Sequence, residues 1–300
     1  MNTKSLLLAA SLLAAAPAAQ AQPSPATWAE KQVKISDELT LHYVEQGDPT
    51  GTPVVFLHGY SDSWHSYEPV LPHLPPSVHA YALSQRGHGN SSKPAAGYHP
   101  DDFAADLAAF LNRFGIRQAV VVGHSMGGTV AQAFALRYPE RVSALVLAGS
   151  FADFNKESMH EMSKLVATFT DPVDAGFGRE FQRSSLHRPI PEAFFETMVQ
   201  ESGKLPARVW QGVMAGLLRA DFTKRLPALR VPALLVWGDR DTMALRDDQQ
   251  RLQAALAGSK LLVYEGTGHA LHWEEPERFA NDLVEFLAWL APADTPTSGR

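Results

Sequence analysis

The sequence predicts an α/β fold with a mostly parallel central sheet flanked by helices. Two observations support this prediction. Short apolar runs, typical of strands buried on both faces, recur along the chain, and segments with helical periodicity separate them. This alternation predicts right-handed crossovers between parallel strands, and it places ligands beyond the carboxyl ends of those strands.

The expected elements follow in chain order. Residues 32–35 and 39–44 alternate as the two strands of an antiparallel edge hairpin, with a turn at 36–38. Buried strands are expected at 53–57, 78–83, 119–122, 142–147, 233–237 and 260–264. Helices are expected at 101–114, 129–138 and 276–290.

The first 21 residues have the pattern of a secretory signal peptide. Lys4 provides a positive start, residues 5–16 are rich in Leu and Ala, and Ala19-Gln20-Ala21 ends the segment with small residues. The apolar run is shorter than the roughly 20 residues that a membrane-spanning helix needs. We therefore expect cleavage near Ala21, a periplasmic or secreted protein, and no stable membrane anchor. An uncleaved anchor is the alternative.

The rest of the chain predicts one large domain with an insertion. The core is expected to comprise residues 22–149 and 227–292, and residues 293–300 are expected to be a disordered tail. Between residues 150 and 226 the strand-like runs vanish, and aromatic and Met residues recur in helical spacing. This segment is predicted to be a helical cap that overhangs the site, although an ordinary helical insertion would show the same pattern.

Composition excludes several classes of function. A net charge of -6 and a pI near 6.0 give no basic surface for a nucleic-acid partner. The absence of cysteine excludes disulfides, thiolate catalysis and Cys-ligated zinc. The 12 histidines contain no H-E-x-x-H arrangement, so no metal is expected, and no motif indicates a cofactor.

One glycine-rich segment predicts the nucleophile. Gly123-His124-Ser125-Met126-Gly127 follows an expected strand and precedes an expected helix, which is the context that a G-x-S-x-G nucleophile elbow requires. Glycine is needed at positions 123 and 127 because a Cβ there would collide with neighbouring backbone in so tight a turn. Ser125 is the expected nucleophile, and the Met126 N–H at the helix start is an expected oxyanion donor.

With this elbow, the chain resembles the α/β-hydrolase fold superfamily over nearly its whole mature length. His58-Gly59-Tyr60 is similar to the family's HG-x segment, which implies that the Tyr60 N–H is the second oxyanion donor. Residues 85–94 are similar to its R-G-x-G-x-S segment. There, Ser84 stands where an Asp is usual two residues before Arg86. This departure predicts a weakened structural ion pair, and we assign Arg86 no catalytic role.

The resemblance also implies the remaining members of a triad, in the chain order Ser, Asp, His. A G-D-x-D segment ends the expected strand at 233–237, and its second aspartate, Asp241, is the implied partner of the histidine. Asp239 is the rival, with an alternative role in bonding turn N–H groups. Gly266-Thr267-Gly268-His269 resembles the family's histidine loop, so His269 is the implied base, and its rival His272 is expected at the loop's exit.

These residues predict an exported serine hydrolase that cleaves carboxylic esters through an acyl-enzyme on Ser125, with a small ester or lactone as substrate. Alternatives with similar triads are a lactonase (acyl-lactones included), a C–C bond hydrolase and a cofactor-free perhydrolase. A non-catalytic binding protein with the same fold is the alternative from another class. Besides Tyr60 and Met126, the candidates for an apolar substrate pocket, or alternatively for core packing, are Trp64, Phe151, Phe154 and Trp210. The sequence indicates no oligomeric state.

Overall fold

The computed structural model of the protein describes residues 28–290. The predicted signal peptide and the predicted tail lie outside the described residues, so export stays a prediction. Within this range, no helix is both long and apolar enough to cross a membrane.

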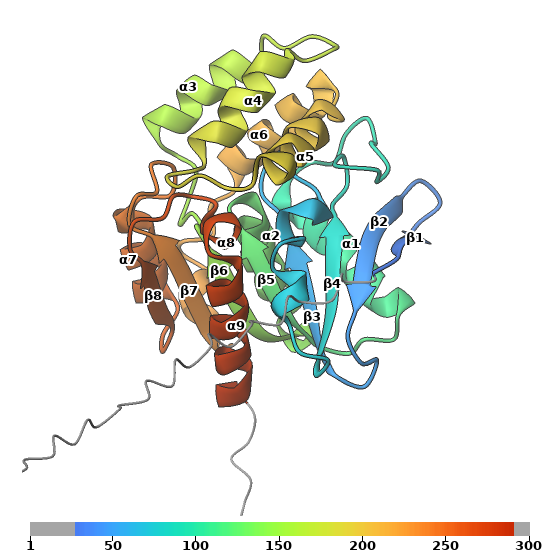
Figure 1. The fold of residues 1–300 in the computed structure, drawn as a ribbon, viewed down its shortest axis with the longest axis vertical. Helices are drawn as coiled ribbons and strands as arrows, with labels where there is room; N and C mark the ends of the chain where they lie inside the picture. Colours follow the sequence, from blue (N-terminus) through green and yellow to red (C-terminus); the bar gives the residue numbers. More distant parts are fainter. Residues whose placement is uncertain (1–27, 291–300) are drawn as a thin grey trace, which may run out of the picture.

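An eight-stranded sheet forms the centre of the molecule, in the order β1-β2-β4-β3-β5-β6-β7-β8 (Figure 1). The first two strands form an antiparallel hairpin at one edge, and all pairs from β4 to β8 are parallel. The strands span Glu30–Lys34 (β1), Thr40–Gln46 (β2), Thr52–Leu57 (β3), Val78–Ser84 (β4), Ala119–His124 (β5), Val142–Ala148 (β6), Ala233–Gly238 (β7) and Lys260–Tyr264 (β8). The predicted fold class is confirmed, and every expected strand is present with ends shifted by no more than two residues.

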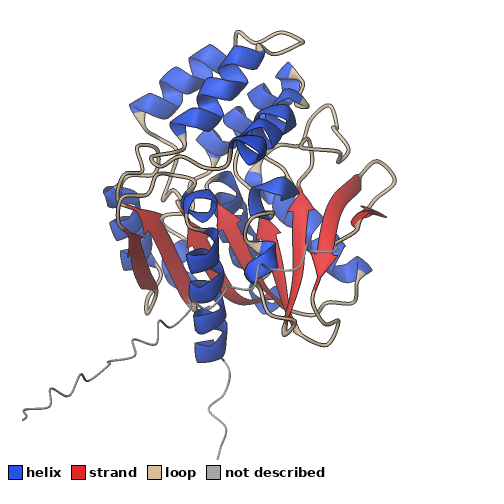
Figure 2. Cartoon of the chain, viewed as in Figure 1, coloured by secondary structure: helices blue, strands red, loops and turns tan. Residues whose placement is uncertain are grey.

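Helices cover both faces of this sheet (Figure 2). Val121 and Leu145 point to the face that packs on α1, α2 and α7, whereas their neighbours Val120 and Val146 point to the face that packs on η1, η2 and α9. Burial on both faces explains why the parallel strands read as continuous apolar runs. The covering elements span Pro100–Arg113 (α1), Met126–Arg137 (α2), Arg246–Ala255 (α7), Trp64–Tyr67 (η1), Leu71–His73 (η2) and Pro276–Leu290 (α9).

Between β6 and β7 the chain forms four helices that lie over one end of the sheet (Figure 1). They belong to residues 150–226, which we call the cap. The cap helices span Glu157–Val166 (α3), Ala175–Ser184 (α4), Glu192–Gly203 (α5) and Ala207–Arg219 (α6). Asp174 accepts a hydrogen bond from the Phe177 N–H at 2.8 Å and so caps the start of α4. The remaining short elements are η3 (Pro139–Arg141), η4 (Leu226–Ala228) and α8 (Leu271–Glu274).

Arg86 forms its ion pair with a carboxylate other than the usual one, which Ser84 replaces. The Arg86 guanidinium donates from Nε and Nη2 to both carboxylate oxygens of Asp106 at 2.5 Å, and from Nη1 to the Gly97 carbonyl oxygen at 2.7 Å. The prediction of a weakened pair is therefore wrong, because α1 supplies the carboxylate that Ser84 lacks. A bidentate arginine pair of this kind is strong and geometrically specific.

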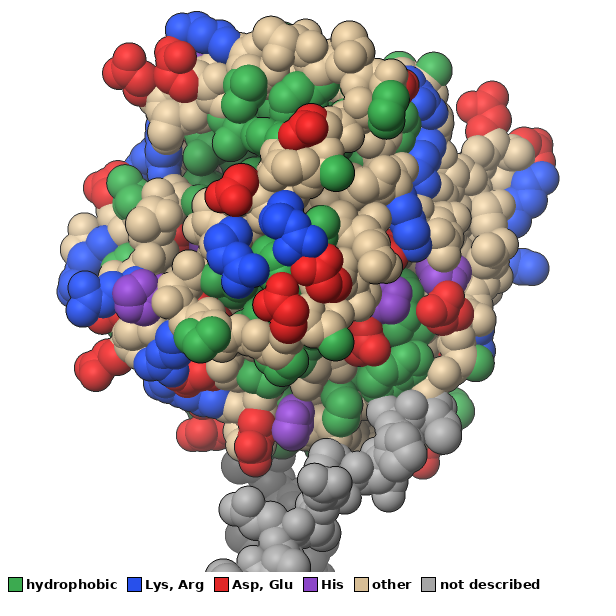
Figure 3. Space-filling model, turned by 45° about the horizontal axis from the view of Figure 1, so that its top comes forward, with side chains coloured by type: hydrophobic (Ala, Val, Ile, Leu, Met, Phe, Trp, Pro, Cys, Tyr) green, Lys and Arg blue, Asp and Glu red, His purple; other side chains and the backbone are tan. Residues whose placement is uncertain are grey.

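Acidic and basic side chains are interspersed on the face drawn in Figure 3, without a continuous area of either sign. Hydrophobic side chains show between them at the cap end of this face.

Candidate active site

Ser125 lies in a strained turn between β5 and α2. Its backbone has φ 51° and ψ -116°, in a region that residues with a Cβ adopt only when the surroundings enforce it. A Cβ at position 123 would lie 2.3 Å from the Gly127 carbonyl oxygen, and a Cβ at position 127 would lie 2.1 Å from the Leu57 carbonyl oxygen. Glycine is therefore required on both sides of the serine, for the steric reason predicted from the sequence.

Asp241 and His269 are hydrogen-bonded to each other. His269 Nδ1 donates to Asp241 Oδ2 at 2.8 Å, and Asp241 Oδ1 accepts from the N–H groups of Met243 at 2.8 Å and Ala244 at 3.0 Å. The carboxylate thus has fixed partners on both oxygens, and both side chains are buried. Because Nδ1 carries the proton, Nε2 is the basic nitrogen of the neutral ring.

The two rivals occupy other positions. Asp239 Oδ1 accepts from the Gly266 N–H at 2.6 Å, so its carboxylate fixes the loop that precedes His269. His272 lies in α8, after the loop's exit, where its ring is fully buried and its Nε2 lies 3.0 Å from Ser66 Oγ. Burial, together with the neighbouring His269, lowers the pKa of His272 to about 3, so this ring stays neutral at physiological pH.

Ser125 and His269 line the same small cavity. The Ser125 hydroxyl has no hydrogen-bond partner within residues 28–290, which leaves it available to a bound molecule. A serine–histidine hydrogen bond is often long in a ligand-free enzyme and tightens when substrate binds. The arrangement can therefore provide a nucleophile, a base and an orienting carboxylate.

The two predicted oxyanion donors, Tyr60 and Met126, line the same cavity as Ser125. Met126 is the first residue of α2, so its N–H has no acceptor within the helix. His58 holds the loop that contains Tyr60: its Nδ1 donates to the Gly59 carbonyl oxygen at 2.7 Å, and its Nε2 accepts from the Gln85 N–H at 3.0 Å. His58 belongs to the HG-x motif, but its part in holding this loop was not predicted from the sequence. Burial lowers the pKa of His58 well below its usual value, so the ring keeps this neutral tautomer.

The sequence pattern of the α/β-hydrolase fold matches residues 52–276, which is most of the chain. The protein belongs to the α/β-hydrolase fold family. It is 30% identical over 275 residues to a non-heme chloroperoxidase of Streptomyces lividans, a match that covers 85% of this chain and 98% of the relative. It is 28% identical over 276 residues to a bifunctional esterase/perhydrolase of Acinetobacter calcoaceticus, covering 85% and 98% of the two chains. Among solved structures, an esterase from Rhodococcus matches with a TM-score of 0.77 and 25% identity over 87% of this chain and 99% of the other.

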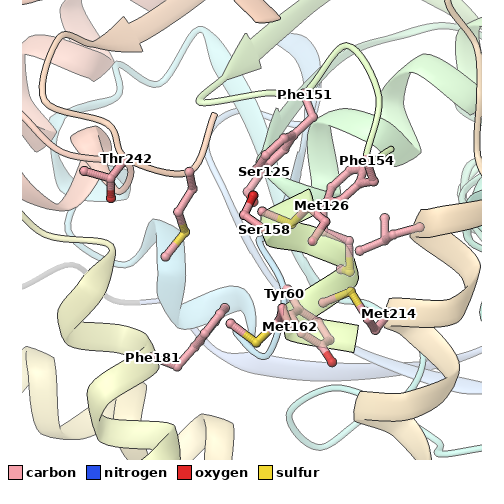
Figure 4. A pocket seen from close by; sticks show the side chains of 13 residues that line it. Tyr60, Ser125, Met126, Phe151, Phe154, Ser158, Met162, Phe181, Met214 and Thr242 are labelled. Atoms are coloured by element: carbon pink, nitrogen blue, oxygen red, sulfur yellow. The ribbon is translucent and has the colours of Figure 1, made fainter. Parts of the chain in front are cut away.

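The largest feature of the hydrolase site is an apolar cavity of about 190 Å³, with Ser125 in its wall (Figure 4). We call it the apolar cavity. Core and cap both contribute to its wall, and five of its lining residues are methionines: Met126, Met159, Met162, Met214 and Met243. Methionine side chains are flexible and polarizable, so such a wall can adapt to ligands of different shape.

The four pocket candidates divide into two pairs. Phe151 and Phe154 line the apolar cavity, and their rings lie 4.4 Å apart between centroids. Trp64 is not among the lining residues, because the chain after Tyr60 turns into η1 and buries this ring on the α9 side of the sheet. Trp210 is not among them either. It lies behind Tyr60, whose hydroxyl donates to the Trp210 carbonyl oxygen at 2.6 Å. As pocket-lining residues, these two candidates are wrong.

Within residues 28–290, no group of three or more His, Asp and Glu side chains could hold a metal ion. The relatives of this hydrolase include an esterase, which supports a hydrolytic enzyme of this fold.

Proposed function

We propose that the protein hydrolyses carboxylic esters through an acyl-enzyme on Ser125, with His269 as general base and Asp241 as the group that orients it. The observation that supports this most is the 2.8 Å hydrogen bond from His269 Nδ1 to Asp241, in a histidine that shares a cavity with the serine. The esterases among the relatives support the same reaction class.

Acylation follows from these positions. The Ser125 hydroxyl attacks the ester carbonyl carbon while His269 Nε2 accepts its proton, and Asp241 stabilises the imidazolium that forms. The N–H groups of Tyr60 and Met126 donate to the negatively charged oxygen of the tetrahedral intermediate. His269 then returns the proton to the departing alcohol, which leaves Ser125 acylated. Water hydrolyses the acyl-enzyme through the same base.

The apolar cavity indicates the kind of acyl group that fits. Its volume is about 190 Å³, and its wall is mostly Met, Phe and Leu. An apolar protein cavity of about 150 Å³ binds benzene. We therefore expect acyl groups up to about the size of a benzoyl or hexanoyl group, with poorer turnover of longer chains.

A chain-length series of p-nitrophenyl esters tests this function, with purified protein and its Ser125→Ala variant compared in parallel. We expect serine-dependent release of p-nitrophenol that declines beyond the six-carbon acyl group. If Ser125 reacts with a fluorophosphonate probe but no ester is turned over, a lactone, a C–C bond or a bulkier ester becomes the substrate to test. If neither ester turnover nor fluorophosphonate labelling is observed, the enzymatic function is wrong and a binding protein remains.

Perhydrolysis is the second candidate, because one relative at 28% identity is named as both an esterase and a perhydrolase. In that reaction hydrogen peroxide replaces water, and the acyl-enzyme yields a peracid and free Ser125. Peracid formation from acetate or an acetate ester and hydrogen peroxide, measured by halide oxidation, would show it.

A further inference from the structure

A second, smaller cavity of about 30 Å³ also reaches Ser125. We call it the polar recess. Its polar side chains are those of Asp62, His124, Gln182 and Ser185, in addition to Ser125 and His269. The rest of its wall includes Tyr60, Phe181, Met243 and Trp273. A cavity needs roughly 10–15 Å³ to hold one water molecule. The recess is therefore large enough for one or two small polar molecules, and too small for an acyl chain.

A buried ring nitrogen without a partner adjoins this recess. His124 Nε2 lies 3.1 Å from the His269 carbonyl oxygen, which can only accept, so Nε2 must be the donor. Burial lowers the pKa of His124 well below its usual value, so the ring is neutral and Nδ1 is a bare acceptor. Among the described residues, Nδ1 has no hydrogen-bond partner. An unpaired buried acceptor of this kind costs free energy unless a small molecule donates to it.

Asp62 faces the same point. A Cβ at Gly59 would lie 2.8 Å from His124 Nδ1 and 3.0 Å from Asp62 Oδ2, so both atoms border the backbone at position 59. Gln182 Nε2 donates to Asp62 Oδ1 at 2.9 Å, and Asp62 Oδ2 accepts a long bond from Ser66 Oγ at 3.4 Å. Burial raises the pKa of Asp62 to about 7, although the bonds from Gln182 and Ser66 oppose it.

The two cavities share Tyr60, Ser125, Phe181 and Met243, and they differ in size and in the polar side chains that line them. The apolar cavity suits the acyl group, so the molecule that later attacks the acyl-enzyme must approach from elsewhere and must reach His269. The polar recess is lined by both Ser125 and His269, and its wall includes His124, whose Nδ1 has no partner among the described residues. We infer that the polar recess is the acyl-acceptor subsite, in which Asp62 and His124 Nδ1 hold the water, or another acceptor of at most two heavy atoms. This inference rests on the proposed esterase function.

The step it serves is deacylation. The oxygen of the bound water forms a bond to the acyl carbonyl carbon while His269 Nε2 accepts one of its protons. When the tetrahedral intermediate collapses, the bond between that carbon and Ser125 Oγ breaks, and His269 returns the proton to Oγ. The products are the carboxylic acid and free Ser125. Asp62 is thus a positioning residue for the attacking molecule, with no part in acylation.

The test separates the two half-reactions with p-nitrophenyl butyrate. Rapid mixing measures acylation as the initial release of p-nitrophenol, and the later steady rate reports deacylation. In Asp62→Asn we expect deacylation to slow about tenfold, as for the loss of one buried hydrogen bond, so that the butyryl-enzyme accumulates and is seen by intact mass. Added hydroxylamine, a stronger nucleophile of two heavy atoms, should restore turnover and form the hydroxamate. The exposed Asp37, substituted Asp37→Asn, is the matched control and should behave as wild type.

The size limit is tested on the wild-type enzyme by acyl transfer to methanol and to 1-butanol at equal concentration. Methanol should compete with water, and 1-butanol should compete at least about tenfold less well, because the recess is too small to admit it. Equal partition to both alcohols would overturn the size limit.

Equal slowing of acylation and deacylation in Asp62→Asn would show that Asp62 has a structural role alone. If Asp62→Asn does not fold, Gln182→Met, which removes a hydrogen-bond donor to Asp62, should show the same selective slowing. A wild-type enzyme that never acylates Ser125 would overturn the proposed function as well, which is a distinguishable result.

Discussion

The core loops and the cap contribute different kinds of residue to the same site. The loops after β5, β7 and β8 place Ser125, Asp241 and His269, and fixed hydrogen bonds or steric limits hold each of them. The cap contributes apolar side chains such as Met162 and Phe181, which line the apolar cavity. The difference teaches that the core supplies the reacting groups of the proposed mechanism, whereas the cap supplies much of the wall that an acyl group would contact.

Removal of the nucleophile is the strongest test of this division. Ser125→Ala should lower turnover of a p-nitrophenyl ester about a million-fold, because only binding and oxyanion stabilisation then remain. His269→Ala should lower it to a similar extent. Steady-state kinetics measure the effect, and an unchanged circular dichroism spectrum shows that the fold is retained. Residual turnover above one per cent in both variants would place the reactive group elsewhere.

The two aspartates after β7 form a matched pair of variants. Asp241→Asn should lower kcat about 10⁴-fold, because an amide no longer holds His269 in the required tautomer. Asp239→Asn should change kcat less than about tenfold, because an amide oxygen can still accept from the Gly266 N–H. The opposite ranking in kcat would assign the orienting role to Asp239.

Acid should weaken the core more than the cap. Buried histidines in the core have lowered pKa values, with His88 at about 4 through burial and His272 at about 3, whereas the cap's His160 is exposed. Below pH 6.5 the unfolded chain binds protons that these rings do not bind in the native state, so the contribution of each ring to stability falls as the pH falls. The raised pKa of Asp62 acts in the opposite sense. Each ring should lower the free energy of unfolding by about 2 kcal/mol between pH 6.5 and 5, which is about 30-fold in the folding equilibrium.

Urea unfolding at pH 7.5 and pH 5 measures this loss. His88→Asn should reduce the pH dependence of the free energy of unfolding, and His160→Asn in the cap should leave it unchanged. An equal reduction in both variants would contradict the assignment of acid sensitivity to the core.

The cap should alter selectivity by a smaller factor. Met162→Trp in α3 places a larger ring in the apolar cavity and should lower kcat/KM for p-nitrophenyl hexanoate about tenfold relative to the acetate. Leu165→Trp, on the same helix but 48% exposed, is the control and should leave this ratio within about threefold. A ratio that shifts equally in both variants would mean that α3 does not form the acyl wall.

Most of the fold could be predicted from the sequence, because buried parallel strands leave an unmistakable pattern of apolar runs such as Pro53-Val54-Val55-Phe56-Leu57. The position of Ser125 could also be predicted, since a tight turn restricts its neighbours to glycine, whereas His269 was implied by the resemblance of its loop to the family's histidine loop. Their catalytic roles stay predictions until the variants are measured.

Contacts between distant segments could not be predicted. Asp106 replaces the missing carboxylate beside Arg86, but nothing in the spacing of the two residues indicates that α1 brings them together. Trp64 and Trp210 are of a residue type that often lines pockets. Whether an aromatic ring faces a cavity, however, depends on the direction of the chain around it. The polar recess likewise unites segments more than a hundred residues apart.

One cap residue limits how this enzyme could be rebuilt. Gln182 of α4 reaches down between the loop that follows β3 and helix α5, with its Nε2 2.9 Å from Asp62 Oδ1, 3.3 Å from Ser61 Oγ and 2.7 Å from Ser202 Oγ. A cap transplanted from another protein would therefore disconnect the loop that follows Tyr60 unless it brought an equivalent amide to the same place. Chimeras cut at residues 150 and 226 should need this one position restored before they become useful catalysts.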